Sequence, residues 1–262
     1  MLKTIKKVIL SALSVLGVSF LICVVMMLNP NLVYSNATTF ENVTIYHNSD
    51  LEPEAENIIR GAIQLISKSS IYKDDIHISM CMNDDSIYPE LFPFAAATAY
   101  AFLNKTVIYD SEPNFKDNRI EFTWAVNNNE TRAYDFTVLM AHEFMHNVQY
   151  NHNPKYQIMS TLGTINWKFE GHADYIVRGF KNDGALLDKI DNYLLQEKKD
   201  HVGVPVFYLE DGTIQNLWYY KCALVIQYLM EEKGMSYDEV CLLDNGLDDV
   251  YAEMLEWKQS SN

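Results

Sequence analysis

The chain has 262 residues, of which 20 are basic and 35 acidic, so its formal net charge is −15. This excess of negative charge repels nucleic acid and anionic lipid headgroups, and we therefore expect no nucleic-acid partner. The sequence has four cysteines, one of them in the apolar N-terminal segment. The other three cannot all pair with one another and lack metal-ligand spacing, so the sequence indicates neither a disulfide scaffold nor a cysteine-based metal site.

The N-terminus combines basic and apolar residues. Lys3, Lys6 and Lys7 precede an uncharged apolar run from Val8 to Leu28. A run of this length is sufficient to cross a bilayer as a helix, so residues 1–28 are predicted to form a transmembrane anchor. The lysines predict a cytoplasmic N-terminus and a location outside the cytoplasm for everything that follows. Removal of the segment as a signal peptide, which would give a secreted protein, is the alternative.

Hydrophobic periodicity divides the remaining chain. Residues 29–40 are polar and predict a linker, and residues 41–262 are long enough for one domain. Before the central motif the pattern predicts strands at 43–47, 76–82 and 105–110 and a helix at 54–67. After residue 170 it predicts helices throughout, at 186–199, 214–233 and 247–257, with a capping box at Ser236 and Glu239.

The most informative motif is His142-Glu143-Phe144-Met145-His146. On a helix, residues four apart lie one turn apart on the same face, so His142 and His146 can bind one cation. Glu143 then lies beside the metal without binding it, where it can take a proton from metal-bound water. The sequence therefore predicts a zinc site with a general base.

The residues around this motif predict the helix that it needs. Asp135 is suited to the first turn, and Pro154 is expected to end the helix after Asn153. Apolar residues recur at helical intervals, which is typical of a largely buried helix. These residues are Phe136, Leu139, Met140, Phe144 and Val148.

Two histidines leave a catalytic zinc ion one protein ligand short. Glu170 can supply it, with Asp174, one helical turn later, accepting the free ring N–H of a ligating histidine. The alternative third ligand is His152, six residues after His146. Gln149 favours the first solution, because it is a good helix former and carries the helix onward, so that His152 moves away from the metal.

A resemblance to known families adds to this interpretation. The HExxH motif followed by Glu170-Gly171-His172-Ala173-Asp174-Tyr175 resembles the gluzincin metallopeptidases, in particular peptidase MA-like domains. The alternative with His152 resembles the metzincins, with Met159 as their methionine turn.

The gluzincin resemblance implies an α+β, zincin-like fold. Its upper lobe has a mixed β-sheet plus helix, its lower lobe is mainly helical, and zinc lies between them. It also implies that Glu170 is the third zinc ligand, that Asp174 orients a histidine, and that the strand nearest the cleft pairs with an extended substrate. Residues 105–110 are the candidate for this strand, and the alternative is that they form an interior strand. A lower-lobe residue usually stabilises the oxyanion, and the candidates are Tyr219, Tyr220 and His201.

The expected function is that of a membrane-anchored, extracytoplasmic zinc metallopeptidase that hydrolyses peptide bonds of a peptide or protein substrate. Its metal ligands are His142, His146 and Glu170, and its general base is Glu143. The alternative from another class is a non-catalytic, membrane-anchored binding or regulatory protein on a peptidase-like fold. A missing ligand or base would favour that alternative, and the chain has all of them.

Overall fold

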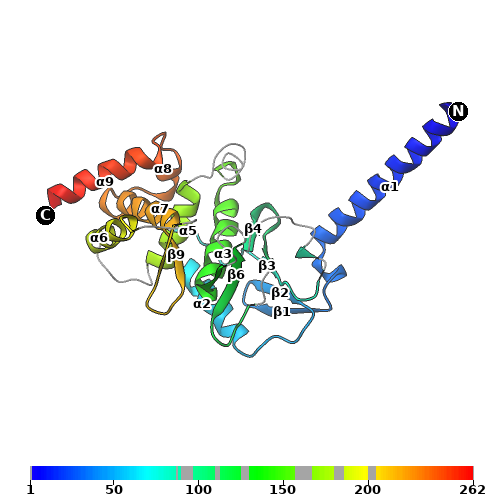
Figure 1. Ribbon diagram of the computed structural model, residues 1–262, viewed down its shortest axis with the longest axis horizontal. Helices are drawn as coiled ribbons and strands as arrows, with labels where there is room; N and C mark the ends of the chain where they lie inside the picture. Colours follow the sequence, from blue (N-terminus) through cyan, green and yellow to red (C-terminus); the bar gives the residue numbers. More distant parts are fainter. Residues whose placement is uncertain are drawn as a thin grey trace.

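A computed structural model describes residues 2–86, 88–89, 97–109, 113–124, 130–156, 167–179, 186–199 and 205–261. The fold is α+β, with a mixed sheet on one side and a group of helices on the other (Figure 1). The described elements that matter for the site are the strands β1 (Asn36–Phe40), β2 (Val43–His47), β3 (Ile78–Cys81), β4 (Ala97–Tyr100) and β5 (Lys105–Ile108), and the helices α2 (Ala55–Ile66), α3 (Phe136–His152), α5 (Trp167–Gly179), α6 (Leu186–Glu197) and α7 (Leu217–Gln227).

The five strands form one sheet in the order β1-β2-β3-β5-β4. The pairs β2–β3 and β3–β5 are parallel, whereas β1–β2 and β4–β5 are antiparallel, so the sheet is mixed. In β2 every second side chain is buried, as its alternating sequence predicts. The expected strand at 43–47 is therefore confirmed. Among the strands that the structure describes, β4 lies at the edge of the sheet, and the sequence pattern did not predict it.

Helix α2 packs its apolar face against α3, which in turn contacts α5. The apolar face of α2 is buried because its residues recur at helical spacing, as predicted. The buried residues are Ala55, Ile58, Ile59, Ala62, Ile63 and Ile66. Helix α3 thus lies between the sheet side of the molecule and the C-terminal helices (Figure 1).

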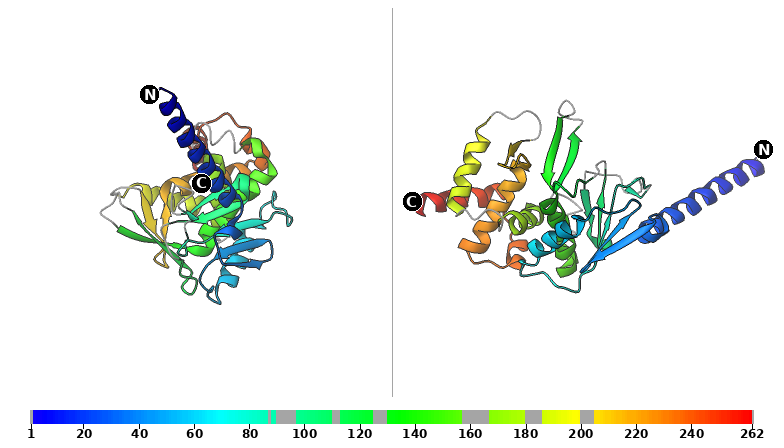
Figure 2. Two further views of the ribbon diagram at one scale, coloured as in Figure 1. Left: turned by 90° about the vertical axis from the view of Figure 1, so that its right-hand side faces the viewer. Right: turned by 90° about the horizontal axis from the view of Figure 1, so that it is seen from below.

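Two β-hairpins complete this middle region. Strands β6 (Arg119–Trp124) and β7 (Glu130–Asp135) pair antiparallel and lead directly into α3. Strands β8 (Val206–Tyr208) and β9 (Ile214–Asn216) form the second hairpin, and β9 contacts β7. The β6–β7 hairpin (green) stands between the five-stranded sheet and the C-terminal helices in the right-hand view of Figure 2.

The C-terminal part differs from the all-helical prediction at β8–β9. The predicted helix at 214–233 is β9, followed by α7 and a π-helical turn over Tyr228–Glu232. Asn216 ends the strand because its side chain accepts a hydrogen bond from Trp218 N and caps α7. The predicted capping box of Ser236 and Glu239 is confirmed at α8 (Tyr237–Cys241), and α9 (Leu247–Ser261) covers the last predicted helix.

The prediction of a transmembrane helix is wrong. A helix, α1, does form from Leu2 to Leu28 and extends away from the sheet (Figure 1), but no helix among the described residues is long and apolar enough to cross a membrane. The predicted linker is also shorter than expected, because its last residues form β1.

Candidate metal centre

Helix α3 carries the HExxH motif, and the local sequence explains why it begins where it does. Asp135 caps the helix, since its side chain accepts a hydrogen bond of 2.9 Å from Val138 N. The helix runs without a break to His152, as the helix-forming Gln149 predicts. His142, Glu143 and His146 all lie in its buried middle section.

Helix α5 brings Glu170 to the same place. It packs tightly on α7 at Gly171, where an added Cβ would lie 2.7 Å from the main-chain oxygen of Cys222. Only glycine permits this approach of two helix backbones, since the neighbouring atom belongs to the main chain and cannot rotate away. Gly171 therefore sets the position of Glu170 and Asp174 relative to α3 and α7.

His142, His146 and Glu170 converge on one point. The distances are 3.2 Å between the two Nε2 atoms, 3.2 Å from His142 Nε2 to Glu170 Oε2, and 3.4 Å from His146 Nε2 to the same oxygen. A tetrahedral ion with bonds of about 2.0–2.1 Å keeps its ligand atoms roughly 3.3 Å apart. The two nitrogens and one oxygen thus fit zinc in both chemistry and spacing, and they are the one such group in the described part of the chain.

Asp174 lies where the resemblance implies it. Its Oδ1 atom is 2.9 Å from His142 Nδ1, and Arg178 Nε lies 3.3 Å from its Oδ2 atom. A carboxylate can only accept here, so His142 carries a proton on Nδ1, and when the ring is neutral the lone pair of Nε2 points toward the cluster. Arg178 was not predicted from the sequence, although its spacing of four residues from Asp174 on α5 is the signal for such a pair.

The charges of the cluster favour a cation. Burial disfavours the charged form of His142, but hydrogen bonds with Asp174 and Glu170 outweigh it and raise the pKa of this ring to about 10. Burial alone would raise the pKa of the Glu170 carboxyl group. The charges and hydrogen bonds of His146 and His142 outweigh burial and hold this pKa well below its usual range. In the metal-free protein a proton thus occupies the place that a metal ion would take.

Glu143 lies beside the cluster and contacts the edge of the sheet. Its Oε2 atom accepts a hydrogen bond of 2.8 Å from Ala99 N on β4, and burial raises the pKa of its carboxyl group. The strand nearest to Glu143 is therefore β4. The prediction that residues 105–110 form the strand at the cleft is wrong, because β5 is an interior strand paired on both sides.

The two candidate tyrosines on α7 lie in different surroundings. The ring of Tyr219 faces His142 edge to face, with ring centroids 5.7 Å apart, and burial together with the charges of Glu170 and Glu143 raises its pKa. Tyr220 instead donates its hydroxyl to the main-chain oxygen of Lys189, 3.5 Å away on α6. Only Tyr219 is thus placed next to a metal-binding residue, and His201 lies outside the described residues.

Two further histidines on the helices of the site, His152 and His172, are not part of the cluster. His152 Nε2 lies 2.9 Å from Asp238 Oδ1, so the structure directs it toward α8 and not toward His146. Met159, the residue of the metzincin-like alternative, lies outside the described residues. His172 is fully buried, with its ring 4.1 Å from that of Tyr237.

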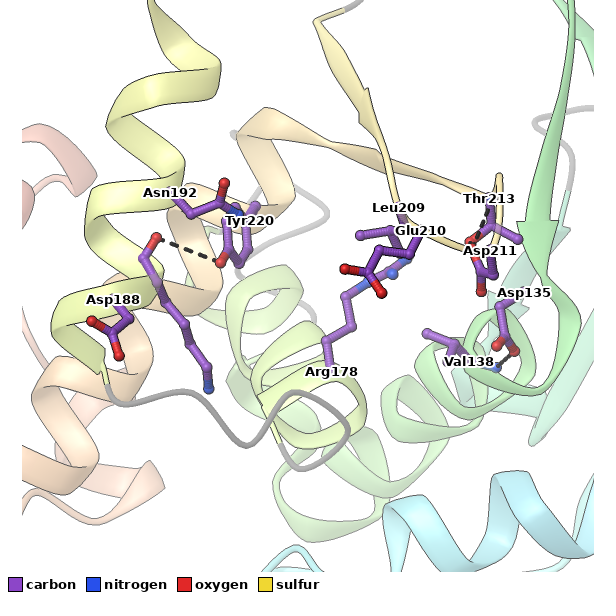
Figure 3. A pocket seen from close by; sticks show the side chains of 11 residues that line it. Asp135, Val138, Arg178, Asp188, Asn192, Leu209, Glu210, Asp211, Thr213 and Tyr220 are labelled. Carbon is purple, nitrogen blue, oxygen red and sulfur yellow. Dashed lines mark hydrogen bonds between the residues drawn. The ribbon is translucent and has the colours of Figure 1, made fainter.

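A cavity of about 490 Å³ is lined by the first turn of α3, the last turn of α5, helix α6 and the turn between β8 and β9, and none of the three metal-binding residues lines it. Val138 lies one turn before His142 on α3, and Arg178, which pairs with Asp174, links the cavity wall to the residues around the metal centre. Figure 3 shows Tyr220 beside Asn192 on one side of the cavity and Arg178 nearer to Leu209 and Glu210 of the second hairpin. Tyr220 therefore lines the cavity.

Comparison of the chain with protein-family profiles, with curated proteins and with solved structures found no match. The interpretation of the site therefore rests on its own residues and their geometry.

Proposed function

We propose that the chain is a zinc-dependent hydrolase that cleaves peptide bonds. The observation that carries the proposal is the triangle of donor atoms from His142, His146 and Glu170, with the buried carboxyl group of Glu143 beside it. Structural zinc sites usually have four protein ligands, whereas catalytic sites have three and leave the fourth position to water or substrate. Three donors and an adjacent base match the catalytic type.

In peptide hydrolysis, the side chains of the site would have the following roles. Bound zinc would supply a Lewis acid and lower the pKa of water. Glu143 accepts a proton from the attacking water and later delivers it to the leaving amine, for which its raised pKa makes it better suited than an exposed glutamate. The hydroxyl of Tyr219 is the candidate donor to the oxyanion that forms on the former carbonyl oxygen.

The substrate that fits this site best is an extended peptide. Strand β4 is at the edge of the sheet, and its Ala99 N–H points toward Glu143, so the outer side of the strand runs along the site. An extended peptide can add to such an edge through main-chain hydrogen bonds.

The proposal is tested on the purified chain by measuring its zinc content and its cleavage of a peptide library. We expect about one zinc per chain and cleavage that a chelator abolishes. Glu143→Gln should keep the zinc and lose cleavage, while Glu256→Gln, the same change at an exposed position on α9, should alter neither.

Two outcomes would contradict the proposal. Folded protein that takes up no zinc would remove its basis. Zinc binding without cleavage of any peptide would point to the non-catalytic binding function.

The location outside the cytoplasm is also a proposal, supported by the basic residues that precede the apolar N-terminal segment. Fractionation of cells that express the full chain tests it, and recovery only from the cytoplasm would contradict it.

A further inference from the structure

Gln149 is a fully buried amide one helical turn after His146 on α3. A buried amide must have its hydrogen-bonding groups satisfied, or its burial destabilises the fold. The partners of Gln149 come from both helices that supply the metal-binding residues. They are His146 on α3, and Phe169 and His172 on α5.

These contacts fix the orientation of the amide group. Gln149 Nε2 lies 2.9 Å from the main-chain oxygen of Phe169, which can only accept a hydrogen bond. The nitrogen must therefore face α5, and its second hydrogen points to His172 Nδ1 at 3.2 Å. The oxygen is left to face His146.

The orientation of the amide in turn fixes the proton on His146. Gln149 Oε1 lies 2.8 Å from His146 Nδ1 and can only accept, so Nδ1 must carry the hydrogen. The lone pair of His146 Nε2 then points to the cluster, where it lies 3.4 Å from Glu170 Oε2. The main-chain oxygen of Phe169, the residue before Glu170, thus fixes the Gln149 amide, and the amide fixes the proton of His146. As a result, His146 Nε2 faces the same point as the Glu170 carboxylate.

We propose that Gln149 is a positioning residue for the metal centre: it holds His146 in the tautomer that binds metal and ties α3 to α5 so that His146 and Glu170 meet. This inference rests on the proposed zinc-dependent function. It assigns to the second histidine the kind of support that Asp174 gives to the first, but with a neutral amide in place of a carboxylate. His172 contributes as the fixed acceptor, held in place by the ring of Tyr237.

The first test is Gln149→Leu, which keeps a similar volume and removes both hydrogen-bonding functions. Its zinc dissociation constant should rise by about 10–100-fold, the usual effect of removing a partner that orients a metal-binding histidine. The matched control is Gln227→Leu, another buried glutamine, which bonds to Lys189 and Glu231 away from the site. The control should bind zinc as the wild type does. Equal zinc affinity in both variants would overturn the proposal.

The second test needs no variant and no metal. ¹⁵N NMR of the histidine side chains distinguishes the two neutral tautomers, at a pH above the titration of the ring. We expect His146 to carry its proton on Nδ1 in the metal-free wild-type protein and to lose this preference in Gln149→Leu.

The outcomes of the two tests separate this inference from the proposed function. A proton on His146 Nε2 in the wild-type protein would overturn the role of Gln149, whether or not Gln149→Leu folds. If the wild type binds no zinc while His146 keeps its proton on Nδ1, the zinc-dependent function fails and the orienting role of Gln149 is supported.

Discussion

The two sides of the metal centre are built in different ways. On α3, one helix with regular spacing is enough to place His142, Glu143 and His146. On the opposite side, Glu170 and Tyr219 belong to α5 and α7, and their positions depend on how closely these helices pack. The first side is therefore local and could be identified from a short motif, whereas the second side exists only in the folded chain.

The largest expected effect comes from removing the metal-binding atom that α5 supplies. Glu170→Gln replaces a carboxylate with a neutral amide, a poor zinc ligand, so we expect the zinc dissociation constant to rise by more than about 100-fold, with loss of cleavage. Equilibrium dialysis with elemental analysis measures it. His152→Ala is the control, because His152 contacts Asp238 and not the cluster. Loss of zinc in His152→Ala with retention in Glu170→Gln would show that His152, and not Glu170, is the third zinc ligand.

The next test concerns α7 and uses neighbouring tyrosines. Tyr219→Phe should lower kcat by about 10²–10³-fold with zinc content unchanged, as expected when one oxyanion donor is removed. Tyr220→Phe is the matched control, since this hydroxyl bonds to Lys189 in the cavity wall. Comparable activity of the two variants in steady-state assays would show that Tyr219 is a packing residue.

The features that the sequence predicted are those set by local pattern, and the features that it missed depend on packing between distant segments. The α3 motif, the amphipathic α2 and the strand β2 were predictable because each has a regular local pattern. The edge strand β4 and the hairpins were not, since short strands derive their stability from partners distant in the sequence. Glu170 was reached through the spacing of its motif, but no local pattern could place it 3.2 Å from His142 Nε2.

Asp174 links the two sides, and its effect depends on pH. In the metal-free protein its carboxylate helps to raise the pKa of His142 from 6.5 to about 10, so a proton competes with zinc over this range. Zinc affinity should therefore increase as pH rises from 6.5 to 10. The protonated ring also stabilises the metal-free fold fully below pH 6.5, and this contribution is lost as pH rises toward 10.

Asp174→Asn removes the charge and the best acceptor for the ring N–H. We expect a loss of about 10–100-fold in zinc affinity at alkaline pH, where no proton competes. The loss should be smaller at neutral pH, because the variant ring also binds its proton less tightly. Competition titrations with a chelator across this pH range measure both effects, and parallel curves for the two proteins would contradict the role of Asp174.

The smallest expected effect comes from a single methyl group between α5 and α7. In Gly171→Ala the new Cβ would lie 2.7 Å from Cys222 O, and one of the helices must move. Overpacking of this kind costs about 1–3 kcal/mol, which thermal unfolding detects as a fall in Tm of several degrees. Gly17→Ala is the control, because no atom lies within 4 Å of the added carbon.

The zinc affinity of Gly171→Ala tests how the two sides of the site depend on each other. The α3 residues keep their spacing in this variant, whereas Glu170 moves with α5. Zinc binding should therefore weaken by more than the loss of fold stability alone explains. If Tm falls while zinc binds as tightly as in the wild type, the position of α5 is not what brings Glu170 to the two histidines.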